Sequence, residues 1–227
     1  METQPDLTFY FAIHDAQRAA VRRYRDAVAD LVETDRRQRG AALARWAKGF
    51  TLELEEHHYV EDEFFFPSLR TKVPTARSVL DDLDAQHRHL DQLLAQWPST
   101  LRQLADPAVP FAAAQRDAIA FASELHDFIH CHLAIEDQDV LPLFWRNYTA
   151  AEYDVVFQQA VKKGKKAGLW FVAPFTVDCY PEGPERDAFL ASVPGILRLI
   201  HRLVRPRYDR LVRTAFGDET VDVPTAP

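Results

Sequence analysis

Apolar residues recur with helical spacing along most of this chain. The first stripe lies within residues 8–37 and contains Val21, Tyr24, Val28 and Leu31, which fall on one face of a helix. Three more stripes of the same kind occupy residues 41–66, 80–97 and 121–145. Because none of them shows the alternation of polar and apolar residues that a half-buried strand requires, the pattern predicts an all-α protein with four long helices.

Histidines and glutamates continue these apolar stripes at positions where hydrophobic residues are expected. His14 lies on the first stripe and His87 on the third. The second and fourth stripes each contain a histidine followed four residues later by a glutamate, in the pairs His57-x3-Glu61 and His132-x3-Glu136. Residues four apart share one face of an α-helix, so each pair points together into the core. Polar groups buried there need partners, because burying them unpaired would cost several kcal/mol.

This arrangement occurs twice along the chain. In each half a lone histidine comes first, the pair follows on the next stripe, and a proline follows the pair at the same interval, at Pro67 and Pro142. A proline removes a backbone donor, so each one bends or ends its helix just past the pair. The repeat predicts two similar helix pairs that bring four histidines and two glutamates to one centre. Imidazole and carboxylate together suit first-row transition metals, and helical bundles can hold two such ions.

Composition limits the class of protein. The 227 residues are 47% hydrophobic and include only 7 glycines, which suits a soluble, mainly helical chain with a full core. The apolar runs are too short to span a bilayer, polar residues follow Met1, and the 2 cysteines provide no disulfide framework. We therefore expect a cytoplasmic protein without a transmembrane segment. A net charge of −7 argues against nucleic acid as a partner.

The repeat stops near residue 148, and the remainder of the chain has the pattern of a helical extension. We expect residues 1–148 to form the bundle, residues 149–217 to form helices that pack on it, and residues 218–227 to be a flexible tail. Arginines recur along the last helical segment, from Arg198 to Arg213. The simplest interpretation is a solvated helix face, and the alternative is a weak contact between this basic C-terminal helix and an anionic surface.

On the residues quoted above, the chain resembles the hemerythrin-like, or HHE cation-binding, family over about residues 7–146. The resemblance implies an up-down-up-down four-helix bundle around a non-heme di-iron centre, in which an oxo, hydroxo or water group bridges two iron ions. It also implies terminal nitrogen ligands from four histidines and bridging carboxylates from two glutamates, namely His14, His57, His87, His132, Glu61 and Glu136.

Three further residues are candidates around this centre. His58 lies three positions before Glu61, close enough in angle to serve as an extra ligand. Tyr10 lies one turn before His14, where it could cap the site or simply pack in the core. The oxygen carriers of the family have one more histidine, one turn after the one on the third helix, where this chain has Asp91. Asp91 could accept a hydrogen bond from a ligand histidine, and its presence puts reversible oxygen storage in doubt.

The residues leave three functions open. The first is a di-iron protein that reacts with peroxide, dioxygen or nitric oxide, in catalase-like turnover or redox scavenging. The second is an iron, oxygen or redox sensor, or an oxygen-binding module without turnover, whose extension reports the state of the metal. The third is a di-iron oxidase of an organic substrate. No residue selects among O2, H2O2 and NO as the small-molecule partner.

Overall fold

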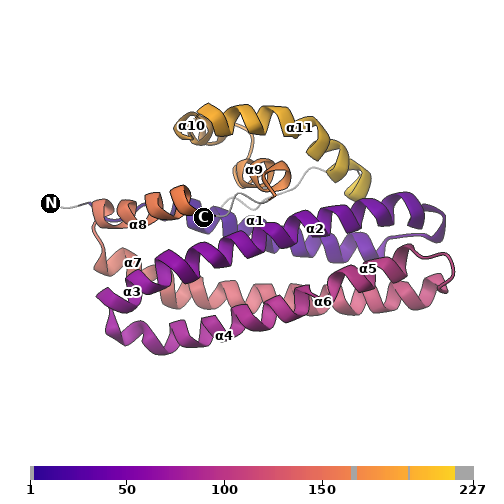
Figure 1. The fold of residues 1–227 in the computed structure, drawn as a ribbon, viewed down its shortest axis with the longest axis horizontal. Coiled ribbons are helices and arrows are strands. Elements are labelled where there is room, and N and C mark those ends of the chain that lie inside the picture. Colours follow the sequence, from indigo (N-terminus) through magenta and orange to yellow (C-terminus); the bar gives the residue numbers. More distant parts are fainter. Residues whose placement is uncertain (1–2, 165–167, 194, 218–227) are drawn as a thin grey trace.

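The computed structural model describes residues 3–164, 168–193 and 195–217. Within these ranges every regular element is a helix, which confirms the all-α prediction. The long helices run alternately up and down and form the predicted bundle (Figure 1). They are α1 (Thr8–Ala29), α2 (Arg36–Val60), α4 (Arg77–Leu94) with its continuation α5 (Trp97–Ala105), and α6 (Phe111–Ile135). None of the described helices combines the length and the apolar character that crossing a membrane requires.

The first helix ends earlier, and the second begins earlier, than the periodicity predicts. The sequence predicts a first helix within residues 8–37 and a second within 41–66, but α1 ends at Ala29 and α2 begins at Arg36. Gln115 of α6 accounts for the early end. Its side-chain amide donates hydrogen bonds to carbonyl oxygens at the end of α1 and just beyond it, those of Val28, Ala29 and Leu31. The carbonyl groups that a helix end leaves unpaired are thereby satisfied by a neighbouring helix.

Both helices that carry a histidine and glutamate pair change to π-helical geometry at the glutamate. The two π-helical turns are η2 (Glu61–Phe65), followed by α3 (Phe66–Lys72), and η4 (Glu136–Val140), followed by α7 (Leu141–Asn147). Pro67 and Pro142 explain both turns, because a proline offers no N–H to the carbonyl four residues earlier and its ring clashes with that carbonyl. The helix therefore widens for one turn instead of ending, and π-helical turns of this kind are frequent at functional sites.

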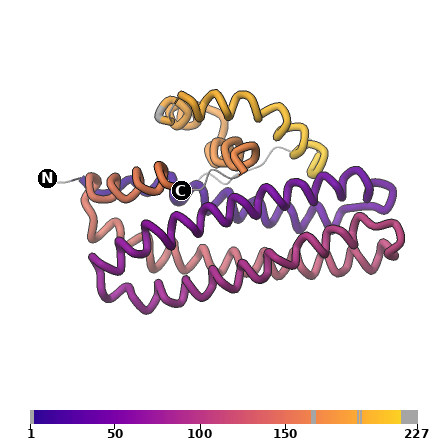
Figure 2. The backbone as a smooth tube through the Cα atoms, in the orientation of Figure 1, coloured from indigo at the N-terminus to yellow at the C-terminus, as the bar shows by residue number. Residues whose placement is uncertain are grey.

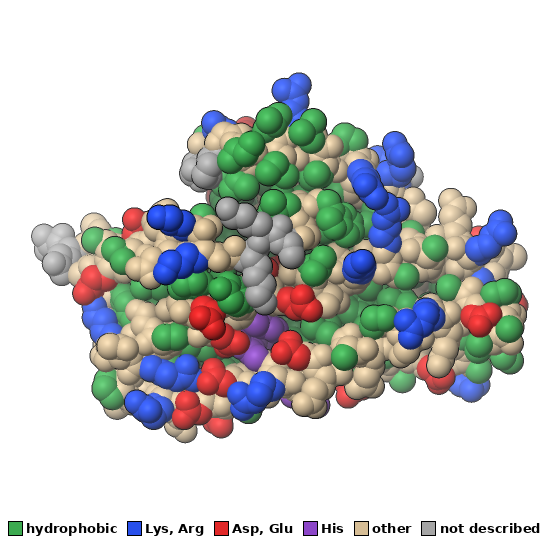
Figure 3. Space-filling view, viewed as in Figure 1, with side chains coloured by type: hydrophobic (Ala, Val, Ile, Leu, Met, Phe, Trp, Pro, Cys, Tyr) green, Lys and Arg blue, Asp and Glu red, His purple; other side chains and the backbone are tan. Residues whose placement is uncertain are grey.

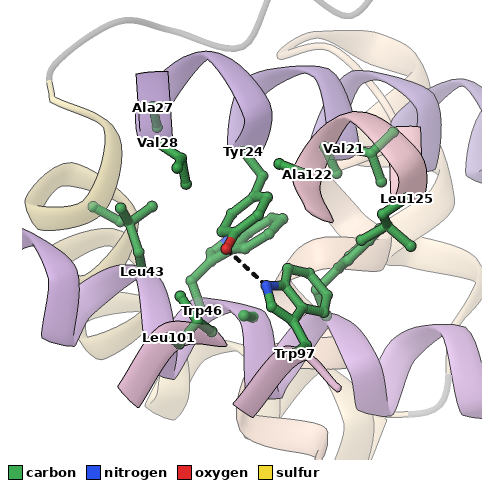
Figure 4. Close-up of a cluster of buried hydrophobic side chains, with 14 of the residues drawn as sticks. Val21, Tyr24, Ala27, Val28, Leu43, Trp46, Trp97, Leu101, Ala122 and Leu125 are labelled. Atoms are coloured by element: carbon green, nitrogen blue, oxygen red, sulfur yellow. Dashed lines mark hydrogen bonds between the residues drawn. The ribbon is translucent and has the colours of Figure 1, made fainter. Parts of the chain in front are cut away.

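Two hydrophobic clusters fill the bundle, and the buried histidines lie between them. In the larger cluster, Tyr24 accepts a hydrogen bond of 2.7 Å from the Trp97 indole N–H and stacks on Trp46 (Figure 4). The smaller cluster closes the other end of the bundle around Phe66 and Phe144. Along each of the four helices, the polar positions come after residues of one cluster and before residues of the other. The polar centre is thus shielded by apolar packing at both ends.

Four helices follow the bundle and lie against α1 and α2 (Figures 1 and 2). They are α8 (Ala150–Lys163), α9 (Leu169–Asp178), α10 (Pro184–Ser192) and α11 (Gly195–Phe216). α9 approaches α2 closely, because a Cβ atom added to Gly49 would lie only 2.2 Å from the ring of Phe171. At the end of α11, the rings of Phe216 and Trp46 meet edge to face with centroids 5.0 Å apart. The predicted C-terminal helical extension is therefore present, while the tail predicted for residues 218–227 lies outside the described residues.

Candidate metal centre

Seven buried polar side chains meet between the two hydrophobic clusters. They come from α1, α2, α4 and α6 and from the first residue of each π-helical turn, and none is more than 8% exposed: His14, His57, His58, Glu61, His87, His132 and Glu136. The six ligands predicted from the sequence are brought together in space. His58, which the sequence left open as an extra ligand, lies among them.

The donor atoms form two groups that each suit one cation. In the first group, donor atoms of His14, His57, Glu61 and Glu136 all lie within 4.8 Å of one another. The second group contains ring nitrogens of His58, His87 and His132 within the same limit of 4.8 Å. The rings of His58 and His87 are stacked, with centroids 4.1 Å apart. Imidazole nitrogens and carboxylate oxygens at this spacing are a donor set that first-row transition metals prefer.

Each glutamate faces at least one histidine of each group. The two carboxylate oxygens of Glu136 lie 3.2 Å from His14 Nε2 and 3.1 Å from His132 Nε2. Those of Glu61 lie 3.4 Å from His57 Nε2 and 3.6 Å from His87 Nε2. Both carboxylates therefore extend between the two groups, which is the arrangement that a bridge between two cations requires.

Many of these donor atoms have no hydrogen-bond partner among the described residues. They are the Nε2 atoms of all five histidines, His58 Nδ1, Glu61 Oε2 and both carboxylate oxygens of Glu136. A buried polar atom without a partner costs about 1–3 kcal/mol, so a folded protein rarely retains so many in one place. Metal cations satisfy all of them at once, and the donor set therefore fits metal binding.

Three of the histidines are held through their other ring nitrogen. The Nδ1 atoms lie within hydrogen-bond distance of side-chain oxygens of neighbouring residues: His14 with Asp137 at 2.7 Å, His87 with Asp62 at 2.9 Å and His132 with Gln86 at 3.1 Å. These contacts orient each ring so that Nε2 faces the centre. Asp62 and Asp137 were predictable as hydrogen-bonding neighbours because each follows a glutamate of the centre. Gln86 was missed, since a half-buried residue next to a histidine has no distinguishing pattern.

Tyr10 contacts the first donor group directly. Its hydroxyl is buried and donates a hydrogen bond to Glu61, and its ring meets that of His14 edge to face with centroids 5.0 Å apart. Burial and the nearby charge of Glu61 raise the pKa of the Tyr10 hydroxyl well above its ordinary value. The tyrosine therefore retains its proton and acts as a hydrogen-bond donor at this position.

Asp91 lies away from the centre. It is exposed on α4, and the carboxylate within hydrogen-bond distance of His87 is that of Asp62 instead. His58 of α2, the candidate for an extra ligand, brings a fifth imidazole to the centre in the second donor group. The histidines that belong to neither group are His89, His126, His130 and His201.

Burial and neighbouring charges set the protonation of the central side chains. Burial lowers the pKa of both His57 and His58 well below the ordinary value, and the other histidines act in the same direction. Burial and the charge of Glu136 raise the pKa of Glu61. Burial also acts to raise the pKa of Glu136, but His132, His87 and His14 together outweigh it and hold that pKa well below its usual range. Neutral imidazoles and carboxylates are the forms that bind cations, so a proton on Glu61 must leave when metal binds.

Acidic side chains surround histidine side chains on one face of the molecule. Figure 3 shows this group on the face to which α2 and α4 contribute. Acidic surroundings attract cations and raise their local concentration.

One buried carboxyl lies outside both donor groups. Glu53 precedes His57 by one turn of α2, is only 3% exposed, and accepts hydrogen bonds of 3.1 and 3.4 Å from the side-chain amide of Gln17. Burial raises its pKa from 4.5 to about 8, against the lowering effect of Gln17. The folded protein therefore holds a proton on Glu53 at neutral pH that the unfolded chain releases.

Glu53→Gln is expected to stabilise the metal-free protein at neutral and higher pH. The pKa of Glu53 is raised on folding, so below about pH 4.5 the carboxyl is protonated in both the folded and the unfolded chain and does not destabilise the fold. As the pH rises from 4.5 toward 8, the unfolded chain releases this proton and the folded state becomes progressively less stable. At pH 7 the substitution should raise the free energy of unfolding by about 3 kcal/mol, and at pH 4.5 the two proteins should agree. Urea unfolding in the presence of a chelator measures both values. Glu55→Gln, on the exposed side of the same helix, should show no such change, and a pH-independent difference for Glu53→Gln would contradict the assignment.

Comparison with protein families identifies the bundle. The family model described as the hemerythrin HHE cation binding domain matches residues 7–144, which is more than half of the chain. The chain therefore belongs to this family, whose domain binds metal cations, and its buried cluster of histidines and glutamates fits a metal site. Comparisons with curated proteins and with solved structures gave no match.

Proposed function

We propose that this member of the hemerythrin HHE family holds two iron ions and reacts with peroxide or dioxygen as a redox scavenger with catalase-like turnover. The observation that carries the proposal is the unequal composition of the two donor groups. One contains two imidazoles and the other three, with two carboxylates shared between them. A small ligand would therefore find its place on the side with fewer imidazoles, which is also the side of Tyr10.

The ligand assignment follows from these groups. We assign His14 and His57 to one ion and the remaining three imidazoles of the centre to the other, with Glu61 and Glu136 between the ions. Five imidazoles and two carboxylates provide more donors than one octahedral ion can accept. When bound there, a pair of iron ions supplies the two electrons that cleavage of an O–O bond requires.

The protein's own side chains would control protons and orientation at this site. The Tyr10 hydroxyl, which donates to Glu61, lies beside the imidazoles of His14 and His57. Its hydrogen bond keeps the Glu61 carboxylate in place and offers a donor group to a ligand on the same side. Asp62, Asp137 and Gln86 hold three of the rings in the orientation that directs Nε2 inward.

The extension has a supporting role in this proposal. We propose that residues 1–148 form the metal-binding bundle and that residues 149–217 cover its α1 and α2 side without contributing a ligand. The close approach at Gly49 and the contact between Trp46 and Phe216 support this division, because both are far from the donor groups along α2.

Tyr10→Phe tests the proposed chemistry. The variant should bind iron as the natural chain does, yet consume peroxide more slowly by on the order of 10²-fold in kcat/KM, since a positioned hydrogen-bond donor is lost. Iron content and initial rates of peroxide loss are measured on the same anaerobically reconstituted samples. Tyr59→Phe, at a tyrosine that packs on Phe64, serves as the control.

The same samples separate the alternatives. Loss of peroxide no faster than with free iron, together with an oxygen adduct that releases O2 intact, would assign the protein to the oxygen-binding modules instead. Stoichiometric oxidation by O2 or NO without turnover would favour the sensor.

A further inference from the structure

The first half of α11 exposes an apolar stripe that the metal centre does not explain. Ile196, Leu199 and Leu203 are 64%, 51% and 71% exposed. Their spacing places them within one face of the helix. Figure 3 shows hydrophobic side chains gathered at the surface around α10 and α11. Large aliphatic side chains adjacent on one face at such exposure are uncommon on a soluble surface and mark an interaction site.

This stripe lies beside the face with which α11 packs on the rest of the protein. The buried residues of the helix are Tyr208, Leu211, Ala215 and Phe216, all in its second half. In the first half, Leu197, Ile200 and Val204 point to the protein side and are partly buried. The apolar surface of α11 is therefore wider than the face that packs on the protein, and Ile196, Leu199 and Leu203 form its exposed part, called the outer face below.

Exposed arginines lie beside the stripe and beyond its end. Arg198 and Arg202 lie on its solvent side, and Arg207 and Arg210, four and seven residues after Leu203, continue the same face along the helix. The single acidic residue of α11 is Asp209, and its carboxylate lies 2.6 Å from Arg205 Nε. The outer face thus has a strong positive charge in a chain whose net charge is −7.

We propose that the outer face of α11 binds the surface of an anionic lipid bilayer. The aliphatic stripe would enter the boundary between headgroups and acyl chains, and the arginines beside it and beyond its end would contact phosphate groups. The chemistry of the face matches both layers of such a surface, because long arginine side chains reach past the apolar residues to the headgroups. Exposed Glu185 and Asp187 of α10 confine the contact to α11, since they repel an anionic surface.

A second copy of the chain is a poorer occupant of the same face. A symmetric dimer would pair this face with itself and bring four exposed arginines of each copy together. Like charges at an interface oppose association, and no exposed acid on α11 compensates them. The arginines therefore favour an anionic partner over self-association.

Co-sedimentation of the full chain with vesicles tests the proposal. Binding is compared between vesicles of phosphatidylcholine alone and vesicles that contain phosphatidylglycerol as well, at low and at physiological salt. We expect binding only to the anionic vesicles, weaker at higher salt. Leu199→Glu with Leu203→Glu should lower the partition coefficient at least about tenfold, and Arg198→Glu with Arg202→Glu should do the same.

Val155→Glu with Val161→Glu is the matched control, because it places the same two charges at half-exposed aliphatic residues of α8. It should bind anionic vesicles as the natural chain does, and all variants should retain the iron content of the natural chain. Equal binding to neutral and anionic vesicles, or no binding to either, would overturn the proposal. A concentration-dependent dimer that Leu199→Glu with Leu203→Glu abolishes would assign the face to a second copy of the chain.

Discussion

Glu136→Ala is expected to abolish metal binding and to remove the stabilisation that metal provides. Glu136 is fully buried, and its two oxygens face His14 and His132 at 3.2 and 3.1 Å, one histidine from each donor group. In the proposed two-iron centre, both cations would lose a ligand and an opposing charge in a site of low polarity without this carboxylate. At free metal about 1,000 times the dissociation constant, binding stabilises a protein by about 4 kcal/mol, and this increment should disappear.

The measurement combines metal analysis with thermal unfolding. Anaerobically reconstituted natural protein should approach about two irons per chain, as a pair of bridged sites requires, and Glu136→Ala should retain less than one. Glu136→Gln keeps the volume of the side chain and should also lose metal, which separates a ligand role from a packing defect. His89→Ala, on the exposed side of α4, should change neither quantity. Equal iron content in all these proteins would show that the centre binds no metal through Glu136.

The faces of the helices could be predicted because each buried position continues a stripe. His14, His57, His87 and His132 fall where an apolar residue is expected, and each lies between residues of the two hydrophobic clusters. A helical period of 3.6 residues is sufficient to place such side chains on a common side. The sequence therefore predicts the bundle and most of its centre.

Helical periodicity does not predict that His57 and His58 are both buried. His57 and His58 are consecutive and so point about 100° apart on the helix, yet both are buried because α1 and α4 lie on different sides of α2. An argument from periodicity assumes that one side of a helix faces the core. It therefore cannot assign the consecutive residues His57 and His58 to two different donor groups. The π-helical turns at Glu61 and Glu136 are likewise invisible to a fixed period, although the prolines that cause them can be seen.

The boundary between α1 and α2 depended on a contact between distant residues. Gln115 satisfies the end of α1 from α6, and nothing in residues 8–37 indicates that the helix stops at Ala29. Such a tertiary contact overrides local helix propensity. The predicted fold class is unaffected, because the observed helices differ from the predicted ones in where they end and not in which faces are buried.

His58→Leu is expected to change the metal-free and the metal-bound protein in opposite directions. Both ring nitrogens of His58 are buried without a hydrogen-bond partner among the described residues, between the rings of His87 and His132. Leucine removes these unsatisfied atoms, so the free energy of unfolding of the metal-free protein should rise by about 1–3 kcal/mol. A residue that destabilises the metal-free protein and stabilises the metal-bound protein serves metal binding rather than packing.

In the presence of iron the same substitution should lower both the iron content and the stabilisation that metal provides. The second donor group falls from three imidazoles to two, so iron content should drop from about two toward one per chain, and added metal should stabilise the variant less than the natural protein. His130→Leu is the matched control, because its Nε2 is also buried without a partner but belongs to neither group. It should affect stability without affecting iron content. If His58→Leu instead retains the full iron content, His58 is a packing residue, the two groups become equal in imidazoles, and the argument that directs a small ligand toward Tyr10 fails with it.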